Sequence, residues 1–437
     1  MIEHGMSGAL KRLEEEGRPI RIGVVGIGQM GRALTVQTVK LPGIRPCVLV
    51  DHQPARARRI LLEAGVPEGD ILETCRAGEA MAALEAGRTV ISGDDTLPAR
   101  VGMLDVVVDA TGSPEDGARI AAGAIGAGKH VVSLNVESDI VVGPLLAKMA
   151  REAGVVYTGS AGDEPAAVVE LYDFACSMGL TPLVLGKGKN NPVNREATPE
   201  TAAEAARASG MNPRMLASFQ DGTKTMAEMT AMANATGFLP DCPGGHGACG
   251  GVDDLVDLYR LKSQGGILNG YGVVDYVNGV APGVYLIYTT PERELREELR
   301  YLSQGPGPNY LLFRPYHLTS LETPRTILRL ALSGEASIIP RSGAPYAETA
   351  AVAKRDLRAG EYLDGIGGCT VYGTILTYQE ARARDALPIG LVNGRTRMRR
   401  DAAKGELITR EMVELDEESF LLRLWREQEK LLAAGQL

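Results

Sequence analysis

Several kinds of residue are scarce in this sequence. Aromatic residues make up 5% of the 437 residues, cysteine occurs six times and tryptophan once. Six scattered cysteines do not form the dense pattern of a disulfide-stapled secreted domain, so we expect a reducing, cytoplasmic environment. No apolar run approaches the ~18 residues of a membrane helix, and we expect no membrane partner. The first twenty residues carry several acids and no apolar core of a signal peptide, so we expect neither secretion nor import into an organelle.

Positive charge is also in short supply. Lys and Arg total 46 against 55 Asp and Glu, which leaves a net charge of −9. An acidic chain without a basic block is a poor partner for nucleic acid, and none is expected. Glycine, in contrast, is abundant at 53 residues and indicates many tight turns. The hydrophobic fraction of 44% and the charged fraction of 23% are typical of a globular enzyme.

The first part of the chain alternates short apolar runs with Ala-rich segments of helical spacing. After an amphipathic helix over residues 1–18, we expect strands at 21–26, 47–50, 89–92, 104–109, 130–134 and 154–157. Helical patterns over 116–127 and 144–153 lie between later runs. Such alternation predicts a parallel sheet with right-handed crossovers. We therefore predict an α/β fold that begins with a doubly wound domain over residues 1–158.

The pattern changes after this domain. Helices are expected at 165–178 and 223–236, and strands at 183–189 and within 271–288, where Asn-Gly and Pro-Gly indicate turns. The pattern over residues 159–345 therefore predicts an α+β domain, which we expect to serve catalysis and oligomerisation. Residues 346–437 predict a small, Gly-punctuated β-rich module that ends in an acidic amphipathic helix.

One motif stands out in the first domain. Gly26-Ile-Gly28-Gln29-Met30-Gly31 follows a predicted strand and opens a helix, and Asp51 ends the next strand. This is the full context of a dinucleotide-binding (Rossmann) fingerprint, in which glycines let pyrophosphate approach the N-terminus of a helix. Asp51 is expected to bind the adenine ribose, which favours NAD. The cations that follow, at positions 56, 58 and 59, are the alternative for a 2′-phosphate, so NADP stays open.

Two further strand ends are expected at the same edge of the sheet. Ala110, Thr111 and Gly112 follow the strand that ends at Asp109, and Asn135 follows the next one. Small residues at the carboxyl end of a parallel strand line the crevice in which a dinucleotide lies. We expect these four residues to contribute to cofactor binding, with Asn135 on the nicotinamide side.

Three lysines of the middle region are candidates for the chemistry. Lys187 and Lys189 flank one glycine and leave the same face of an extended strand. Their repulsion calls for an anion between them, and crowding lowers a lysine pKa toward neutrality, which suits proton transfer. Lys224 lies at the start of a predicted helix, where a cation opposes the helix dipole by roughly 0.3–1 kcal/mol. We expect it to bind a substrate anion or donate a proton. The alternative for all three is a solvated surface lysine.

Carboxylates and a basic segment complete the candidate set. Asp221 is expected to orient Lys224 or, alternatively, to cap the helix. Glu164 follows the first domain and suits a substrate hydroxyl or a partner for the lysines; the alternative is an acidic residue at a helix N-terminus. Arg314 and His317 combine a cation with a titratable ring, for phosphate binding or a structural hydrogen bond. The segment 242–249 holds two cysteines and one histidine among glycines; it predicts a mobile active-site loop rather than zinc, and no metal is expected.

Several stretches together resemble a known family. The fingerprint with GKHVVSLN is similar to the homoserine-dehydrogenase group, and GEYLDGIGGCTVYG with AKGELIT resembles a SAF module. With GDEPAAVVELYDFA, GKGKNN, SFQDGTKTMAEM and FRPYHL, the combination resembles the DRL proteins, named for an activity like that of 1-deoxy-D-xylulose 5-phosphate reductoisomerase. The resemblance covers nearly the whole chain. It implies NAD(P)-linked reduction of a phosphorylated keto-sugar or branched-chain polyol phosphate, with lysines in the site.

The sequence thus predicts an NAD(P)-dependent oxidoreductase with Lys189 or Lys224 as proton donor. Lys187, with Arg314 or His317, is expected to hold the substrate anion. Asn135-Val-Glu137 stands where homoserine dehydrogenases carry Asn-x-Lys, so homoserine dehydrogenase is the second choice. A dinucleotide sensor without turnover is the third. A homodimer or larger homo-oligomer is expected from the strands of the middle domain.

Overall fold

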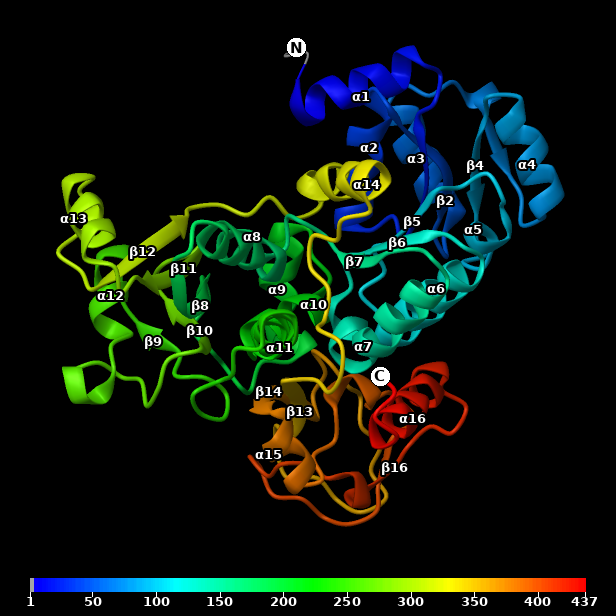
Figure 1. The fold of residues 1–437 in the computed structure, drawn as a ribbon. Coiled ribbons are helices and arrows are strands. Elements are labelled where there is room, and N and C mark those ends of the chain that lie inside the picture. Colours follow the sequence, from blue (N-terminus) through cyan, green and yellow to red (C-terminus); the bar gives the residue numbers. More distant parts are fainter. Residues whose placement is uncertain (1–3) are drawn as a thin grey trace. The chain divides into compact units, whose positions relative to one another are not determined.

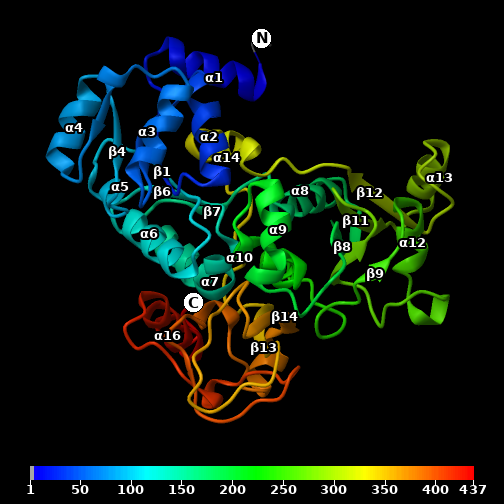
Figure 2. The same cartoon turned by 180° about the vertical axis from the view of Figure 1, so that it is seen from behind.

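The chain folds into two compact units. The computed structural model describes residues 4–437. Unit 1 consists of the residues up to 163 together with 318–342 and 423–437, and unit 2 consists of 164–317 and 343–422. The division differs from the expected three consecutive domains because two later segments return to unit 1. Both units can be followed from two sides in Figures 1 and 2.

Unit 1 is built on a parallel sheet of seven strands. Their order is β3-β4-β2-β1-β5-β6-β7, and each neighbouring pair is parallel. The strands are β1 (Ile20–Val25), β2 (Ile44–Val50), β3 (Ile71–Glu73), β4 (Thr89–Ser92), β5 (Val106–Asp109), β6 (His130–Ser133) and β7 (Tyr157–Gly159). The predicted doubly wound sheet is confirmed. The sequence pattern missed β3, whose three residues are too few to show alternation.

Helices connect and cover these strands. They are α1 (Gly5–Glu15), α2 (Gln29–Lys40), α3 (Pro54–Glu63), α4 (Ala77–Glu85), α5 (Leu97–Arg100), α6 (Pro114–Gly126), α7 (Val136–Glu152), α14 (Thr323–Ser333) and most of α16 (Phe420–Ala433). Figure 1 shows α2 and α14 on one side of the strands and α6 and α7 on the other. The helix expected over 1–18 is shorter, and residues 1–3 lie outside the described part.

The start of α7 corrects the expected boundary at residue 144. The helix begins at Val136 because Asn135 caps it, its Oδ1 accepting the Ser138 N–H at 3.3 Å. Pro144 therefore lies inside the helix. Gln428 of α16 donates to Val141 O at 2.9 Å and accepts from Leu145 N at 3.1 Å. The last helix of the chain is thus fastened to this part of unit 1.

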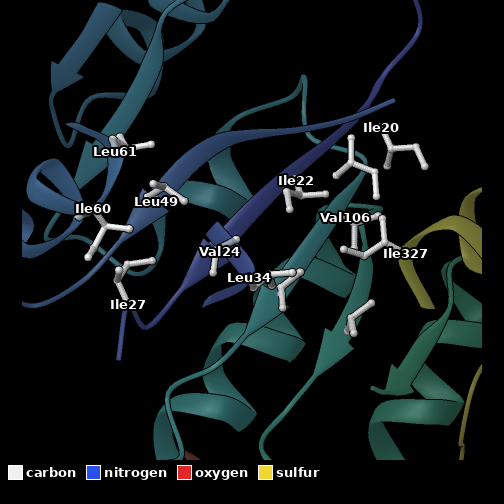
Figure 3. Packing of buried hydrophobic residues seen from close by; sticks show 14 of the residues in the cluster. Ile20, Ile22, Val24, Ile27, Leu34, Leu49, Ile60, Leu61, Val106 and Ile327 are labelled. Atoms are coloured by element: carbon white, nitrogen blue, oxygen red, sulfur yellow. The ribbon is translucent and has the colours of Figure 1, made fainter. Parts of the chain in front are cut away.

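The core of unit 1 packs the central strands against two helices from distant parts of the sequence. Ile22 and Val24 of β1 have no exposed surface and lie with Leu34 of α2 and Ile327 of α14 in one cluster (Figure 3). Strands buried on both faces need apolar residues at nearly every position. The run Ile20–Val25 satisfies that requirement, so it was readable in the sequence.

Unit 2 contains a mixed sheet of five strands in the order β12-β11-β8-β10-β9. These strands are β8 (Thr181–Lys189), β9 (Ala248–Cys249), β10 (Val273–Asn278), β11 (Val284–Thr289) and β12 (Asn309–Arg314). The helices are α8 (Glu164–Ser177), α9 (Pro199–Ser209), α10 (Pro213–Gln220), α11 (Thr223–Thr236), α12 (Leu255–Leu258), α13 (Arg293–Tyr301) and α15 (Tyr378–Ala383). Helices α8 and α11 pack on one face of the sheet.

The C-terminal part of unit 2 adds two small antiparallel sheets. One pairs β13 (Ala347–Ala353) with β14 (Val371–Thr377), and the other pairs β15 (Arg397–Met398) with β16 (Val413–Glu414). A hydrogen bond of 2.8 Å between Thr230 of α11 and Thr349 of β13 ties the first sheet to the rest of the unit. Among residues 4–437, no helix is long and apolar enough to cross a membrane.

Candidate active site

The glycine loop of unit 1 joins β1 to α2. Gly26 adopts a φ of +91°, and a Cβ there would stand 2.7 Å from the Ala110 carbonyl oxygen. A Cβ on Gly31 would stand 1.9 Å from the Gly26 oxygen, so both glycines are required by close backbone contacts. Around Gly28 a Cβ would meet nothing within 4 Å. The first N–H groups of α2, including those of Gln29 and Met30, have no partner within the helix. Open space before free N–H groups fits a pyrophosphate.

Asp51 connects this loop to the end of β2. Its Oδ2 accepts the Ile27 N–H at 3.0 Å, and its Oδ1 accepts the Gln53 N–H at 2.9 Å. The side chain is 2% exposed and lies 3.2 Å from the Arg56 guanidinium. Asp51 therefore holds the glycine loop in place, in addition to the ribose contact that its position predicts.

Only one of the three arginines considered for a 2′-phosphate stands beside Asp51. Arg58 forms ion pairs with Glu68 and, at 3.1 Å, with Glu73. Arg59 faces Glu63 at 3.8 Å. Arg56 is thus the remaining candidate for discriminating NADP from NAD.

The ends of β5 and β6 meet as predicted. Thr111 donates its N–H and hydroxyl to Asp109, and Asn135 Nδ2 donates to Thr111 Oγ1 at 3.2 Å and to Ser113 O at 2.8 Å. Asn135 is 1% exposed, so its amide braces this edge of the sheet. The expected contact of Asn135 with nicotinamide stays a prediction. Ala110 packs against the glycine loop, and Gly112, with a φ of +70°, turns the chain away.

The two lysines of unit 2 lie side by side on β8. Lys187 and Lys189 are each 6% exposed, which excludes the alternative of two surface lysines. In the sheet Lys187 pairs in register with Tyr276 of the parallel β10 and with Val284 of β11, which pairs with Arg314 of β12. These residues therefore form one row across the sheet.

Lys187 is neutralised by the protein itself. Its Nζ lies 2.7 Å from the partly buried Glu164 and also contacts the buried Glu228 of α11. Burial alone lowers the pKa of Lys187, but the two carboxylates outweigh it and raise the pKa above its ordinary value. The anion expected between the lysines is thus this carboxylate pair. A role of Lys187 in holding the substrate anion does not fit a cation with two partners.

The two carboxylates themselves titrate differently. Burial alone raises the pKa of Glu164, but the charges of Lys187 and His317 lower it to about 2. Burial and the charge of Glu164 raise the pKa of Glu228. His317 Nε2 lies 3.4 Å from Glu164 Oε1, so His317 belongs to this cluster.

Lys189 has a different environment. Its Nζ donates to the Phe219 carbonyl oxygen at 2.7 Å, and no carboxylate pairs with it among the residues that the structure describes. Burial and the neighbouring charge of Lys187 lower the pKa of Lys189 to about 8. The expected lowering of a lysine pKa is confirmed here, while the pKa of Lys187 moves in the other direction.

Lys224 and Asp221 are not the pair that the sequence suggested. Lys224 is the second residue of α11, half-buried, and its charge acts on Glu228 one turn later. Asp221 has no exposed surface and faces Lys354 of the C-terminal part at 2.7 Å. Its Oδ1 accepts the Thr223 N–H at 2.8 Å, so Asp221 caps α11. The structure supports the alternative, a structural Asp221, over a role in orienting Lys224.

The basic segment after β12 is also paired. Arg314 lies 3.0 Å from Glu170 of α8 and over the ring of Tyr316. With His317 beside Glu164, the two residues expected to bind phosphate both face carboxylates of α8. The expected anion clamp of Lys187, Arg314 and His317 is therefore replaced by a network of internal ion pairs.

The segment 242–249 is anchored, where a mobile loop was expected. The fully buried Asp275 of β10 accepts the N–H of His246 at 3.1 Å and of Gly247 at 3.3 Å. His246 Nε2 lies 2.7 Å from Asp241. Within residues 4–437, no group of three or more metal-ligating side chains is found.

Three residues beside the lysines of β8 were missed in the sequence. Glu228 pairs with Lys187, Tyr276 lies in register with Lys187, and the charge of Arg195 acts on Lys189. The spacing of four between Lys224 and Glu228 on one helix was the available signal for Glu228. No sequence motif around Arg195 or Tyr276 indicated a function, because the residues that they contact lie on elements distant in the sequence.

Comparison with known proteins identifies the segment that holds these residues. Residues 162–323 match the family model described as the catalytic domain of the oxidoreductase DRL. This segment is similar to the DRL catalytic domain. It contains Glu164, both lysines of β8, Lys224 and His317. The resemblance to DRL proteins is confirmed, and the chain is an oxidoreductase with a dinucleotide-binding fold. The resemblances to homoserine dehydrogenases and to SAF modules stay predictions.

Curated proteins and solved structures were also compared. No curated protein matches the sequence significantly. A probable dehydrogenase from Thermotoga maritima is 16% identical with a TM-score of 0.40, covering 74% of this chain and 91% of that one. Scyllo-inositol dehydrogenase from Lactobacillus casei, with bound NAD(H) and scyllo-inositol, is 14% identical with a TM-score of 0.40 and coverages of 74% and 92%. Myo-inositol dehydrogenase from Corynebacterium glutamicum is 11% identical with a TM-score of 0.41 and coverages of 73% and 90%.

Proposed function

We propose that the chain is an NAD(P)-dependent oxidoreductase that acts on a phosphorylated keto-sugar or polyol, with Lys189 as the proton donor. One observation carries the choice of Lys189: it is a buried lysine without a carboxylate partner in the described structure, with a pKa of about 8. An acid whose pKa lies near the working pH transfers protons efficiently. Lys187, locked between two carboxylates, is a positioning residue in this scheme.

The cofactor is proposed to bind unit 1. The open space at Gly28 and the helix N-terminus after it suit the pyrophosphate, and Asp51 suits the adenine ribose. Gly26, Gln29, Met30 and Gly31 would hold the pyrophosphate with their backbone, and Ala110, Thr111 and Gly112 would line the nicotinamide side. When bound, the dinucleotide supplies or accepts a hydride. NAD and NADP both remain in the proposal, since Arg56 stands beside Asp51.

Proton transfer is assigned to the residues of unit 2. In the direction of reduction, the Lys189 ammonium protonates the oxygen of the substrate carbonyl as negative charge develops there. The Phe219 carbonyl holds the ammonium by one of its three N–H groups, which leaves two for the substrate. In the direction of oxidation, the neutral amine removes the hydroxyl proton. Lys224 is the second candidate for this role.

The phosphorylated substrate is supported by the DRL resemblance of the catalytic segment. The deciding experiment titrates the purified chain with NADH and NADPH and then screens phosphorylated keto-sugars and polyols against homoserine. The readout is absorbance at the nicotinamide band. Turnover of a phosphorylated compound is expected. Turnover of homoserine alone would make the chain a homoserine dehydrogenase, and cofactor binding without any turnover would make it a sensor.

Assembly and location remain parts of the same proposal. A homodimer or larger assembly is expected, and static light scattering that shows a monomer would remove it. All six cysteines are free in the described structure, as suits the proposed reducing cytoplasm.

A further inference from the structure

Two cations of unit 2 converge on the end of one helix. Lys189 donates to the Phe219 oxygen at 2.7 Å, and Arg195 donates to the Asp221 oxygen at 2.7 Å. Both carbonyls belong to the last turn and cap of α10, where cations are favourable. Within the described chain neither cation pairs with a carboxylate: the nearby Asp221 and Glu228 carboxylates pair with Lys354 and Lys187. The hydrogen bonds of both cations thus go to backbone oxygens.

Capping the helix uses only some of the hydrogen-bond donors of these two side chains. A guanidinium has five N–H donors, and Arg195 directs only Nη1 to protein oxygens, at 2.7 Å to Asp221 O and at 3.5 Å to Gly373 O. Its plane is fixed by stacking on Tyr372 of β14, with 4.6 Å between the guanidinium carbon and the ring centroid. The remaining edge, with Nε and Nη2, has no partner in the described structure. A fixed guanidinium edge suits the oxygens of a phosphoryl group.

A third polar group stands at the same place. Tyr276 is 6% exposed, and its hydroxyl forms no hydrogen bond with any described residue. This hydroxyl can therefore donate to an oxygen of a bound ligand. Tyr276 pairs in register with Lys187, so it shares the sheet face of both lysines and lies diagonally from Lys189. The charge of Arg195 acts on the pKa of Lys189 and of Tyr276. Gly247 packs against the phenol, where a Cβ would come within 2.3 Å of the hydroxyl.

We propose that Arg195 and Tyr276 form a phosphoryl-binding subsite beside Lys189. This inference rests on the proposed function, because the anion would be the phosphate group of the substrate that Lys189 protonates. It replaces the ion-paired Lys187, Arg314 and His317 as the anion clamp. The proposal also assigns a role to the C-terminal part of unit 2, because Tyr372 and Gly373 hold Arg195 in position.

The subsite is tested by titrating the full chain with inorganic phosphate, followed by isothermal calorimetry, with sodium chloride keeping ionic strength constant. Measurements are repeated with saturating NADH, because the glycine loop of unit 1 also suits phosphate. We expect Arg195→Gln to weaken the phosphate binding that persists in the presence of NADH at least tenfold, and Arg195→Lys to recover part of it. Arg207→Gln, an exposed arginine on α9, serves as the matched control and should bind like the parent chain.

Two results would overturn the subsite: no phosphate binding by the parent chain in the presence of NADH, or equal binding by Arg195→Gln. If Arg195→Gln does not fold, Tyr276→Phe provides the test, with an expected loss of about threefold. Glycerol 3-phosphate and glycerol are compared in the same titration. Glycerol should not bind, and the affinities of glycerol 3-phosphate and free phosphate show which of the two the subsite prefers. Phosphate binding that depends on Arg195, without turnover of any carbonyl compound, would overturn the proposed function and leave the subsite intact.

Discussion

The glycine loop of unit 1 and the lysine-bearing strand β8 of unit 2 form their sites by different means. The loop is made of backbone: Gly26 and Gly31 allow close contacts, and one carboxylate, Asp51, fastens them. The site on β8 consists of buried lysine side chains, and the charge of Lys187 is balanced by Glu164 of α8 and Glu228 of α11. A backbone site is disturbed only by a side chain that alters the chain path or fills the space of the ligand. A site of buried charges depends on every partner, because removing one leaves another uncompensated.

The largest effect is expected from Lys189→Met. Loss of the proton donor should lower kcat by a factor of roughly 10²–10⁴, the range for general acid–base catalysis. NAD(P)H affinity should stay unchanged, as fluorescence titration can check. Lys189→Arg is the matched control that keeps the charge but gives up no proton at neutral pH, so it should be nearly as slow. Unchanged turnover by a folded Lys189→Met chain would remove Lys189 from the mechanism.

Lys187→Met should act on stability instead. Without the ammonium, Glu164 and Glu228 face each other in a buried site, and breaking a buried pair costs about 3–5 kcal/mol. Urea unfolding measures this loss. The deficit should shrink as the pH falls, because protonation removes the repulsion between the carboxylates. The double variant Lys187→Met/Glu228→Gln should regain part of the stability; no difference between the two variants would contradict the pairing.

In unit 1, Gly28→Val and Gly31→Val should separate binding from folding. A Cβ at Gly28 meets no protein atom within 4 Å, so the fold should persist while the pyrophosphate is excluded and cofactor affinity falls at least about tenfold, ~1.4 kcal/mol. At Gly31 the side chain would strike the Gly26 oxygen, so unit 1 should be destabilised as well. Calorimetry with NADH and thermal unfolding distinguish these outcomes. Normal cofactor binding by Gly28→Val would rule out the loop as the pyrophosphate site.

The pH profile should report Lys189. With a pKa of about 8, the fraction of ammonium decreases above pH 8, so the rate of carbonyl reduction should fall up to tenfold per pH unit there. The rate of alcohol oxidation should rise through the same range, because it needs the neutral amine. Single-turnover rates in both directions give the profile. A breakpoint near pH 8 that persists in Lys189→Arg would assign it to another group.

The smallest effects are expected from the arginines after β2. Arg58→Gln breaks ion pairs with Glu68 and Glu73 at the surface, which contribute within about 1 kcal/mol, and should leave cofactor preference unchanged. Arg56→Gln should weaken NADPH binding if the 2′-phosphate lies beside Asp51, and leave NADH binding nearly unaltered. Equal losses for both cofactors would contradict that placement.

Much of unit 1 was predictable. Strands buried on both faces appear as continuous apolar runs, and the glycine fingerprint encodes a turn whose geometry is local. The helix Thr223–Thr236 of unit 2 was predicted to the residue. The return of α14 and α16 to unit 1 was not predictable, since it depends on where distant apolar faces find a partner.

The site of unit 2 was predictable only as a set of residue types. The sequence placed Lys187 and Lys189 on one face of a strand because alternation is a local property of an extended chain. The sequence predicted a lowered lysine pKa without saying which lysine has it, and only the folded chain distinguishes the two. Glu164 and Glu228 reach Lys187 from two helices, while Phe219 offers Lys189 an uncharged carbonyl. Local backbone geometry follows from neighbouring residues, but the pKa of a buried group follows from charges that the tertiary fold brings to it.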